Sequence, residues 1–257
     1  MNFRFAIPLF SGKLAKSFFL GIPSVLLVVL LGTSSGFASD AGLRAAFDGA
    51  DAPEPSRGIQ ATSLARSEYE VAIVQYWSVG PLMRAEAVMS GHNIVTLVSG
   101  DSYSVYDSLT NRGYRIRRSD KAIAGDAKRK RPFGMHLQEI VDQGGEKIRE
   151  ENLDGAPVDI YRVTDEKGRR TLWVQQGEDQ IPIRLESYDR GRGRTGRLDW
   201  INWLAGVQIS KEFFEPPGEV EFEDFGSYEE FRIRMAQGPI SPAPPFFPEL
   251  IDDGSGS

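Results

Sequence analysis

The side chains that could carry acid–base or metal chemistry are few and scattered. The 257-residue chain has two histidines, His92 and His136, and neither has a carboxylate beside it at the spacing of a metal site. It has no G-x-S-x-G elbow for a serine nucleophile and no cysteine for a thiol nucleophile or a disulfide. The run Glu219–Asp224 is typical of a solvated acidic face. We therefore predict that the protein is not an enzyme and uses no cofactor or metal, with esterase or glycosidase chemistry as the least favoured alternative.

Three basic clusters could contact anionic partners. They are Arg115–Arg118, Lys128–Arg131 and Arg190–Arg194. The last resembles an Arg-Gly segment that binds nucleic acid, but it is one short turn in a chain with a formal net charge of -6. We therefore expect no nucleic acid as a partner. The clusters are interpreted as solvated loops, with lipid headgroups or an envelope protein as the alternative partners.

The first 38 residues have the layout of a cleavable secretory signal peptide. Basic residues (Arg4, Lys13 and Lys16) precede an apolar run from Phe18 to Leu31, and small residues end at Ala38. The run is shorter than the roughly 20 residues that span a bilayer, so an uncleaved anchor helix is the less favoured alternative. We expect an exported protein that is located in the periplasm.

The remainder of the chain divides into three parts. Residues 39–63 are rich in small and polar residues and predict a flexible linker. Residues 64–237 carry short apolar runs joined by short polar turns, which predicts an antiparallel meander rather than a doubly wound sheet. Residues 238–257 are Pro-rich and predict an extended tail. The expected strands are 69–79, 84–90, 93–99, 102–107, 112–117, 158–164, 170–175, 181–188, 196–205 and 208–213.

Two short helices are expected beside these strands. Phe133, Leu137, Ile140 and Val141 fall at helical spacing within 120–150, where Gly144 and Gly145 end the pattern. A second helix is expected over 227–236, with Ser227 and Glu230 at the spacing of a capping box. The fold class is therefore α+β, an antiparallel sheet covered by short α-helices.

The bulky apolar residues exceed what two short helices can easily cover. Each one taken singly is best interpreted as core. Together they suggest a covered sheet face with room for an apolar ligand, although neighbours in a strand, such as Tyr76 and Trp77, face opposite sides. The predicted ligand-binding residues are Trp77, Met83, Met89, Tyr161, Trp173, Trp203 and Leu204.

The order of elements resembles the LolA-like family of periplasmic lipoprotein carriers. The resemblance covers most of residues 69–218, and it implies a strongly curved antiparallel β-sheet, a half-open barrel, under a lid of short α-helices. The fold is shared by lipoprotein carriers, outer-membrane acceptors and envelope-stress sensors, so it does not settle the role. The matching strings are Gln75–Pro81, Asn93–Asp107, the lid-like insertion Asp120–Gly145, Glu151–Tyr161, Trp173–Glu186 and the F-x-x-P-P-G string Phe213–Gly218.

One departure from the family pattern concerns the lid. The carriers have an arginine just before the first strand-turn proline that helps to hold the lid closed. This chain reads Ser78-Val79-Gly80-Pro81 there, and the nearest arginine, Arg84, falls in the following strand. The resemblance therefore transfers no lid-latch residue.

Two hypotheses of function follow. The first is a periplasmic carrier or binding protein that holds a lipid, an acyl chain or a lipoprotein anchor between the curved sheet and the helical lid. The second is an envelope sensor or protein-interaction module, which binds another envelope protein through its tail or its basic loops. An elongated apolar cavity of roughly several hundred Å³ under the lid favours the carrier, and a closed core favours the module.

Overall fold

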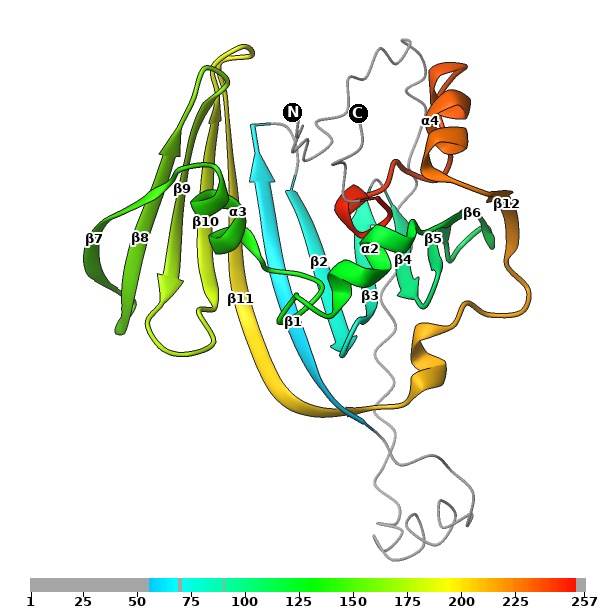
Figure 1. Ribbon diagram of the computed structural model, residues 1–257, viewed down its shortest axis with the longest axis horizontal. Helices are drawn as coiled ribbons and strands as arrows, with labels where there is room; N and C mark the ends of the chain where they lie inside the picture. The colour runs from blue at the N-terminus through cyan, green and yellow to red at the C-terminus, as the bar shows by residue number, and fades with distance from the viewer. Residues whose placement is uncertain (1–55, 69–70, 90, 253–257) are drawn as a thin grey trace, which may run out of the picture. The chain divides into compact units, whose positions relative to one another are not determined.

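The computed structural model describes residues 56–68, 71–89 and 91–252. Twelve strands form one curved sheet in the order β12-β6-β5-β4-β3-β2-β1-β11-β10-β9-β8-β7 (Figure 1). Neighbouring strands are antiparallel except β12 and β6, which run parallel. Within the described residues β12 and β7 do not pair, so the sheet is a half-open barrel. The strands are β1 (Ser56–Ser67), β2 (Val71–Val79), β3 (Leu82–Met89), β4 (His92–Ser99), β5 (Ser102–Asp107), β6 (Arg112–Arg117), β7 (Glu146–Leu153), β8 (Ala156–Thr164), β9 (Gly168–Gln175), β10 (Pro182–Asp189), β11 (Arg194–Ile209) and β12 (Glu221–Phe225).

Short helices cover one face of this sheet. They are α2 (Asp120–Asp126), α3 (His136–Asp142), α4 (Tyr228–Ala236) and the single turn η2 (Pro248–Leu250), whereas the single turn η1 (Lys211–Phe214) packs on the opposite face, against Trp77. The face beneath α2, α3 and η2 is called the inner face below (Figure 1). None of the helices in the described part of the chain combines the length and apolar character needed to cross a membrane.

The inner face has two halves that are covered differently. Strands β2–β6 and β12 form the tail half, whose inner face carries residues 238–252, called the C-terminal segment below. Strands β7–β10 form the helix half, where Ile140 of α3 packs on Leu172 and Val174 of β9. The long strands β1 and β11 lie between the halves and pair with each other.

The structure corrects the predicted start of the domain. Residues 56–63, expected in the linker, belong to β1, which pairs with β2 and β11 in the middle of the sheet. The hydrophobic signal of this strand is weak because its inner positions carry small side chains. Ala61 and Ser63 are fully buried there. The predicted signal peptide and the rest of the predicted linker, through residue 55, lie outside the described residues.

The structure also corrects the predicted tail. Residues 238–252 pack against the inner face instead of extending from the domain, and Ala243, Leu250 and Ile251 are buried in its core. Their apolar side chains have neither the helical nor the strand period, so a pattern search finds no element there. The domain expected over 64–237 therefore includes these residues as well.

Most of the predicted elements are confirmed, with a few exceptions. β5 and β6 have the predicted bounds, and α3 and α4 lie where helices were expected. The strands predicted at 196–205 and 208–213 are instead one long strand, β11, followed by η1. The sequence analysis missed β7, β12 and α2, which are rich in charged residues. In β12 the acidic side chains pair with arginines of β6, at 3.6 Å for Glu221–Arg112.

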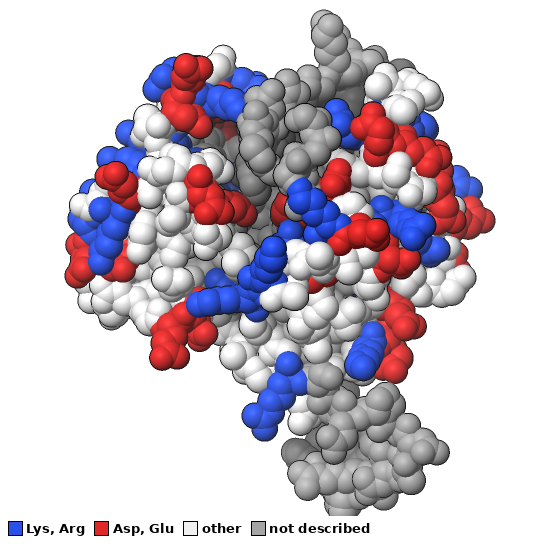
Figure 2. All heavy atoms as spheres, in the orientation of Figure 1, with Lys and Arg blue, Asp and Glu red and all other residues white. Residues whose placement is uncertain are grey.

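The basic clusters do not form one positive surface. Charged side chains of both signs are interspersed over the face of the molecule that carries the helices (Figure 2). Two members of the clusters are buried and structural, so their interpretation as solvated loop residues is wrong. Arg118 donates to the carbonyl oxygens of Leu250 and Gly100, at 2.6 and 2.7 Å. Arg131 is 8% exposed.

Candidate functional site on the inner face

An aromatic cluster lies at the centre of the inner face, where the two halves meet. Tyr76 of β2 is 5.0 Å from both Phe133 and Trp200, measured between ring centroids. Trp200 is 4.9 Å from Trp203 on the same strand, β11. Both tryptophans face inward because a register shift between Thr62 and Ser63 of the partner strand β1 marks a bulge here. The cluster is therefore built from two central strands and the loop that precedes α3.

Arg131 holds this loop against the sheet. Its guanidinium donates to the carbonyl oxygens of Phe133, Gly134 and Asp179, each at 3.1 Å. The same group lies 5.1 Å from the ring of Trp203, within the range of a cation–π contact. Gly134 has a φ of +70°, and a Cβ there would come within 2.8 Å of Trp203. A glycine is thus needed at this position for Phe133 to reach the cluster.

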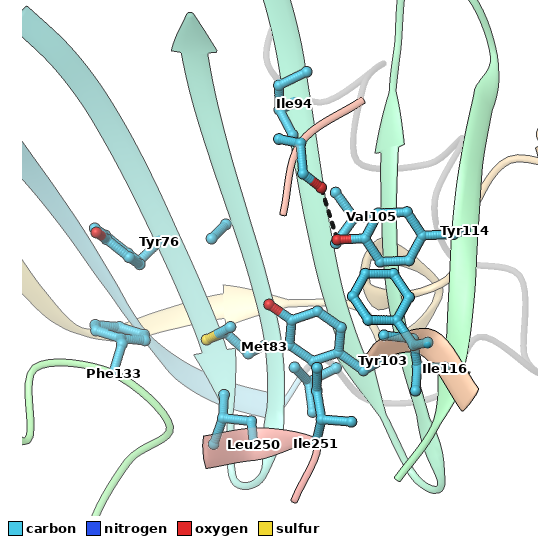
Figure 3. Packing of buried hydrophobic residues seen from close by; sticks show 14 of the residues in the cluster. Tyr76, Met83, Ile94, Tyr103, Val105, Tyr114, Ile116, Phe133, Leu250 and Ile251 are labelled. Atoms are coloured by element: carbon cyan, nitrogen blue, oxygen red, sulfur yellow. Dashed lines mark hydrogen bonds between the residues drawn. The ribbon is translucent and has the colours of Figure 1, made fainter. Parts of the chain in front are cut away.

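The C-terminal segment covers the tail half beside the aromatic cluster. Leu250 and Ile251 lie over Met83 and Tyr103 (Figure 3). Phe247 reaches the cluster itself, with its ring centroid 6.2 Å from that of Tyr76. The inward-facing apolar core of the tail half is therefore covered by the chain's own residues.

Hydrogen bonds from the sheet and α2 fix the path of the C-terminal segment. Tyr114 Oη donates to the carbonyl oxygen of Ala243 at 2.8 Å, the dashed line in Figure 3. The backbone N–H of Phe247 donates to Tyr103 Oη at 3.1 Å. Ser119, the N-cap of α2, donates its N–H to the carbonyl oxygen of Ile251 at 2.9 Å. Most of these bonds join side chains to backbone atoms, and none is part of a strand ladder.

The predicted ligand-binding residues do not share one face. Met83 is fully buried, and Trp203 and Tyr161 are partly buried, all on the inner face. Met89 is half-buried at the end of β3, on the inner side by alternation with Met83. The other residues of the set lie elsewhere. Trp77 and Trp173 face outward, and Leu204 is 46% exposed.

The outward-facing tryptophans have structural partners. Trp77 packs edge-on against Phe213 of η1, at 5.4 Å between ring centroids. Trp173 donates from Nε1 to Glu151 Oε1 at 2.6 Å. Arg84 also lies on the outer face, where it donates to the carbonyl oxygen of Phe213 at 3.1 Å. It is therefore placed away from the lid helices.

Three ionisable groups of α3 and η2 have displaced pKa values. Burial raises the pKa of Glu249 on η2 to about 7, and that of Glu139 on α3 also to about 7. Repulsion from Glu249 adds to the rise in the pKa of Glu139, so the charge on η2 acts on α3. Burial, with Arg170 and Arg131 nearby, lowers the pKa of His136 to about 4, which keeps this imidazole neutral at pH 7. Among the described residues, no three His, Asp or Glu side chains come together as a metal site.

A depression of about 390 Å³ lies on the outer face, near one end of β1, β9, β10 and β11. Thr171 and Arg197 line it, and their neighbours in the strands, Leu172 and Leu198, face inward. Its walls are mainly arginine, glutamate and hydroxyl side chains. It is therefore not the elongated apolar cavity that the carrier hypothesis predicted under the lid. The remaining lining residues are Arg66, Ser67, Glu68, Arg169, Glu186, Ser187, Tyr188, Thr195 and Gly196.

Several residues of the inner-face site are not among the predicted ligand-binding residues. Tyr103 and Tyr114 are fully buried, and their hydroxyl groups hold the C-terminal segment. Phe133 was predicted to belong to a helix, and Phe247 to an extended tail. Only the alternation within strands offered a signal, since Tyr103, Tyr114 and Tyr76 occupy alternate positions that face one side.

Comparisons with known proteins give a likeness of fold alone. No protein-family model and no curated protein matches the chain. An uncharacterized conserved protein from Thermus thermophilus is 14% identical, covers 66% of this chain and 91% of its own, and has a TM-score of 0.48. A putative outer membrane lipoprotein-sorting protein domain from Vibrio parahaemolyticus is 14% identical, covers 68% and 94%, and has a TM-score of 0.31.

A third solved structure is the MucA/MucB complex of Pseudomonas aeruginosa. The matched chain is 12% identical to this one, with a TM-score of 0.40. The match covers 64% of this chain and 57% of the other. Identities and scores at this level describe the arrangement of the sheet and nothing about its ligand. The fold itself is a curved, unclosed sheet, antiparallel except for one pair of strands, with short helices over its inner face, the architecture that the sequence resemblance implied.

Proposed function

We propose that the protein is a periplasmic carrier or binding protein for a lipid, an acyl chain or a lipoprotein anchor. The ligand binds on the inner face of the tail half, in exchange with the C-terminal segment. One observation carries the proposal: this segment covers an apolar sheet face without becoming a strand of the sheet. It therefore occupies the place that an acyl chain would take.

The composition of the C-terminal segment suits a covering that can be exchanged. Residues 238–252 contain five prolines, which have no N–H to donate to a ladder. The segment is held largely by apolar contact, which is non-directional and can be replaced by hydrocarbon. Each CH₂ that an acyl chain buries contributes roughly 0.8 kcal/mol. Binding should therefore strengthen with chain length once the chain is long enough to displace the segment.

A reversible covalent lock tests the exchange. Ser119 Oγ donates to Asp252 Oδ1 at 3.2 Å, and the chain has no cysteine of its own. The double variant Ser119→Cys/Asp252→Cys should form a disulfide that ties the C-terminal segment to the start of α2. We expect the oxidised variant to lose binding of a fatty-acid series, measured by calorimetry, and the reduced variant to regain it.

The lock experiment has internal controls. Ser119→Cys alone removes the cap of α2, whose Ala122 N–H donates to Ser119 Oγ at 3.1 Å, and it cannot form the lock. The wild type should bind more tightly along the fatty-acid series. Affinity that does not change with chain length, or equal binding by the oxidised and reduced double variants, would contradict the proposal.

The second candidate function is an envelope sensor or protein-interaction module. The observation that favours it is the covered inner face, because the tail half is closed by Leu250, Ile251 and their neighbours. Removal of residues 238–257 separates the two functions. A lipid-binding protein should bind acyl chains at least as tightly without this stretch, whereas a module that uses its tail should lose its partner protein.

A further inference from the structure

The most buried part of the aromatic cluster contains polar atoms without partners. Trp200 is 6% exposed, and its Nε1 has no hydrogen-bond partner among the described residues. Nδ1 of His136 is likewise buried without a partner. The two rings lie 6.1 Å apart between centroids, at an interplanar angle of 65°. Two buried nitrogens without partners therefore belong to neighbouring rings where the two halves of the inner face meet.

The other buried tryptophans show that Trp200 is exceptional. Trp203 Nε1 donates to the carbonyl oxygen of Pro182 at 3.2 Å, and Trp173 Nε1 donates to Glu151 at 2.6 Å. A buried indole N–H usually finds an acceptor, and leaving a buried donor unpaired costs about 1–3 kcal/mol. Trp200 is as buried as these residues but has no acceptor within the described chain. An acceptor from a ligand would remove this cost.

We propose that Trp200 Nε1 donates a hydrogen bond to the carbonyl oxygen of an acyl ester or amide bound on the inner face, with His136 Nδ1 as a second polar contact. This inference rests on the proposed function and specifies its ligand class. A neutral carbonyl suits the position because an ionised carboxylate would be buried against Tyr76, Phe133 and Trp203. Burial of a charge costs far more than burial of a neutral acceptor.

The chemistry of His136 is compatible with this role. Its neighbour Arg131 is already engaged with backbone carbonyl oxygens, and Arg170 donates to Gln143. Because both guanidinium groups already make these hydrogen bonds, neither is directed at a ligand carboxylate. His136 is neutral at pH 7, so Nδ1 can donate to a carbonyl oxygen or accept from an amide N–H according to its tautomer.

A pair of ligands that differ only in the carbonyl group tests the inference. A monoacylglycerol and a monoalkylglycerol of equal chain length present the same hydrocarbon and the same glycerol. We expect the wild type to bind the ester about tenfold more tightly than the ether, the value of one buried hydrogen bond of about 1.4 kcal/mol. Trp200→Phe should bring this ratio close to one while retaining the ether affinity.

Trp173→Phe is the matched control, because Trp173 faces outward, where its Nε1 donates to Glu151, and its replacement should not affect the ester-to-ether ratio. A second readout uses the wild type alone: the indole ¹⁵N–¹H signal of Trp200 should move when the ester binds and stay when the ether binds. If both ligands bind equally and the signal does not move, the inference is overturned while the proposed function stands. If neither ligand binds, the proposed function fails.

Discussion

The tail half and the helix half belong to one sheet, but they are covered to different degrees. In the tail half the inner face lies under the C-terminal segment and α4, and Val220 and Phe222 pack on the outer face. In the helix half the inner face lies under α3, a helix of seven residues. The edge strand β7 is largely exposed, and its Ile148 is 41% exposed. Regions with little buried apolar surface open most easily, so local opening is expected in the helix half.

The two halves also differ in how their coverings are attached to the sheet. A strand cannot leave the tail half without breaking a ladder, whereas the C-terminal segment makes no ladder. The proposed exchange would cost apolar contacts and hydrogen bonds such as those to Tyr103, Tyr114 and Arg118. The more covered half of the sheet therefore carries the one covering that belongs to no ladder among the described residues, and the less covered half adjoins it at the aromatic cluster.

The largest effect is expected from a core truncation in the tail half. Phe231 of α4 is fully buried and lies 4.7 Å from Tyr114 between ring centroids. Phe231→Ala should lower the free energy of unfolding by about 3–5 kcal/mol, because it removes buried surface and leaves a cavity. Ile233→Ala, on the same helix but 55% exposed, should change it by less than about 0.5 kcal/mol. Chemical denaturation measures both, and similar losses would contradict the description of this half.

The next effect concerns the contact between the two halves. Arg131→Met should cost roughly 2–4 kcal/mol of unfolding free energy, because it leaves the carbonyl oxygens of Phe133, Gly134 and Asp179 without their donor. Lys130→Met is the matched control, since Lys130 makes one exposed bond to Glu178. Hydrogen exchange should show faster exchange around 131–136 only in the first variant. Equal exchange in both variants would mean that Arg131 does not hold this loop.

The strands of the sheet could be predicted from the sequence because their apolar residues alternate. In β5, Tyr103 and Val105 alternate in this way, and so do the inward-facing residues of its partner β6. Both strands have the predicted bounds. β1 was not predicted because its inward-facing residues Ala61 and Ser63 are small. They leave room for the large rings of Tyr76 and Trp203 on the neighbouring strands. A single sequence does not show which cross-strand partner will fill the space over a small residue.

The inner-face site could be predicted only in part, for a different reason. Alternation separates Tyr76 from Trp77, but it does not say which side the lid covers, and Trp173 faces the opposite side from Tyr161. The C-terminal segment has no period, so its position depends on tertiary contacts such as that between Phe247 and Tyr103. The role of Trp200 depends on an absent hydrogen bond within the described chain, which no sequence pattern encodes.

The smallest effect is expected from the charges that face each other across the inner face. Glu249 belongs to the C-terminal segment and Glu139 to α3, and burial raises the pKa of each to about 7. The folded state then holds protons that the unfolded state releases near pH 4.5. The contribution of these two groups to stability is therefore greatest below pH 4.5, falls as the pH rises towards 7, and is lost above it. Both side chains are only partly buried, so solvent screening keeps the effect below that of the core truncation.

Glu249→Gln removes one of these groups without changing its shape. The variant should melt at a higher temperature than the wild type above pH 7, and the difference should vanish below pH 4.5, where the wild-type carboxyl is also neutral. Glu229→Gln, on the exposed side of α4, controls for the loss of one negative charge. Thermal unfolding across pH 4 to 8 measures all three proteins. A constant difference at every pH would show that Glu249 acts through packing rather than charge, and the electrostatic link between the C-terminal segment and α3 would then be absent.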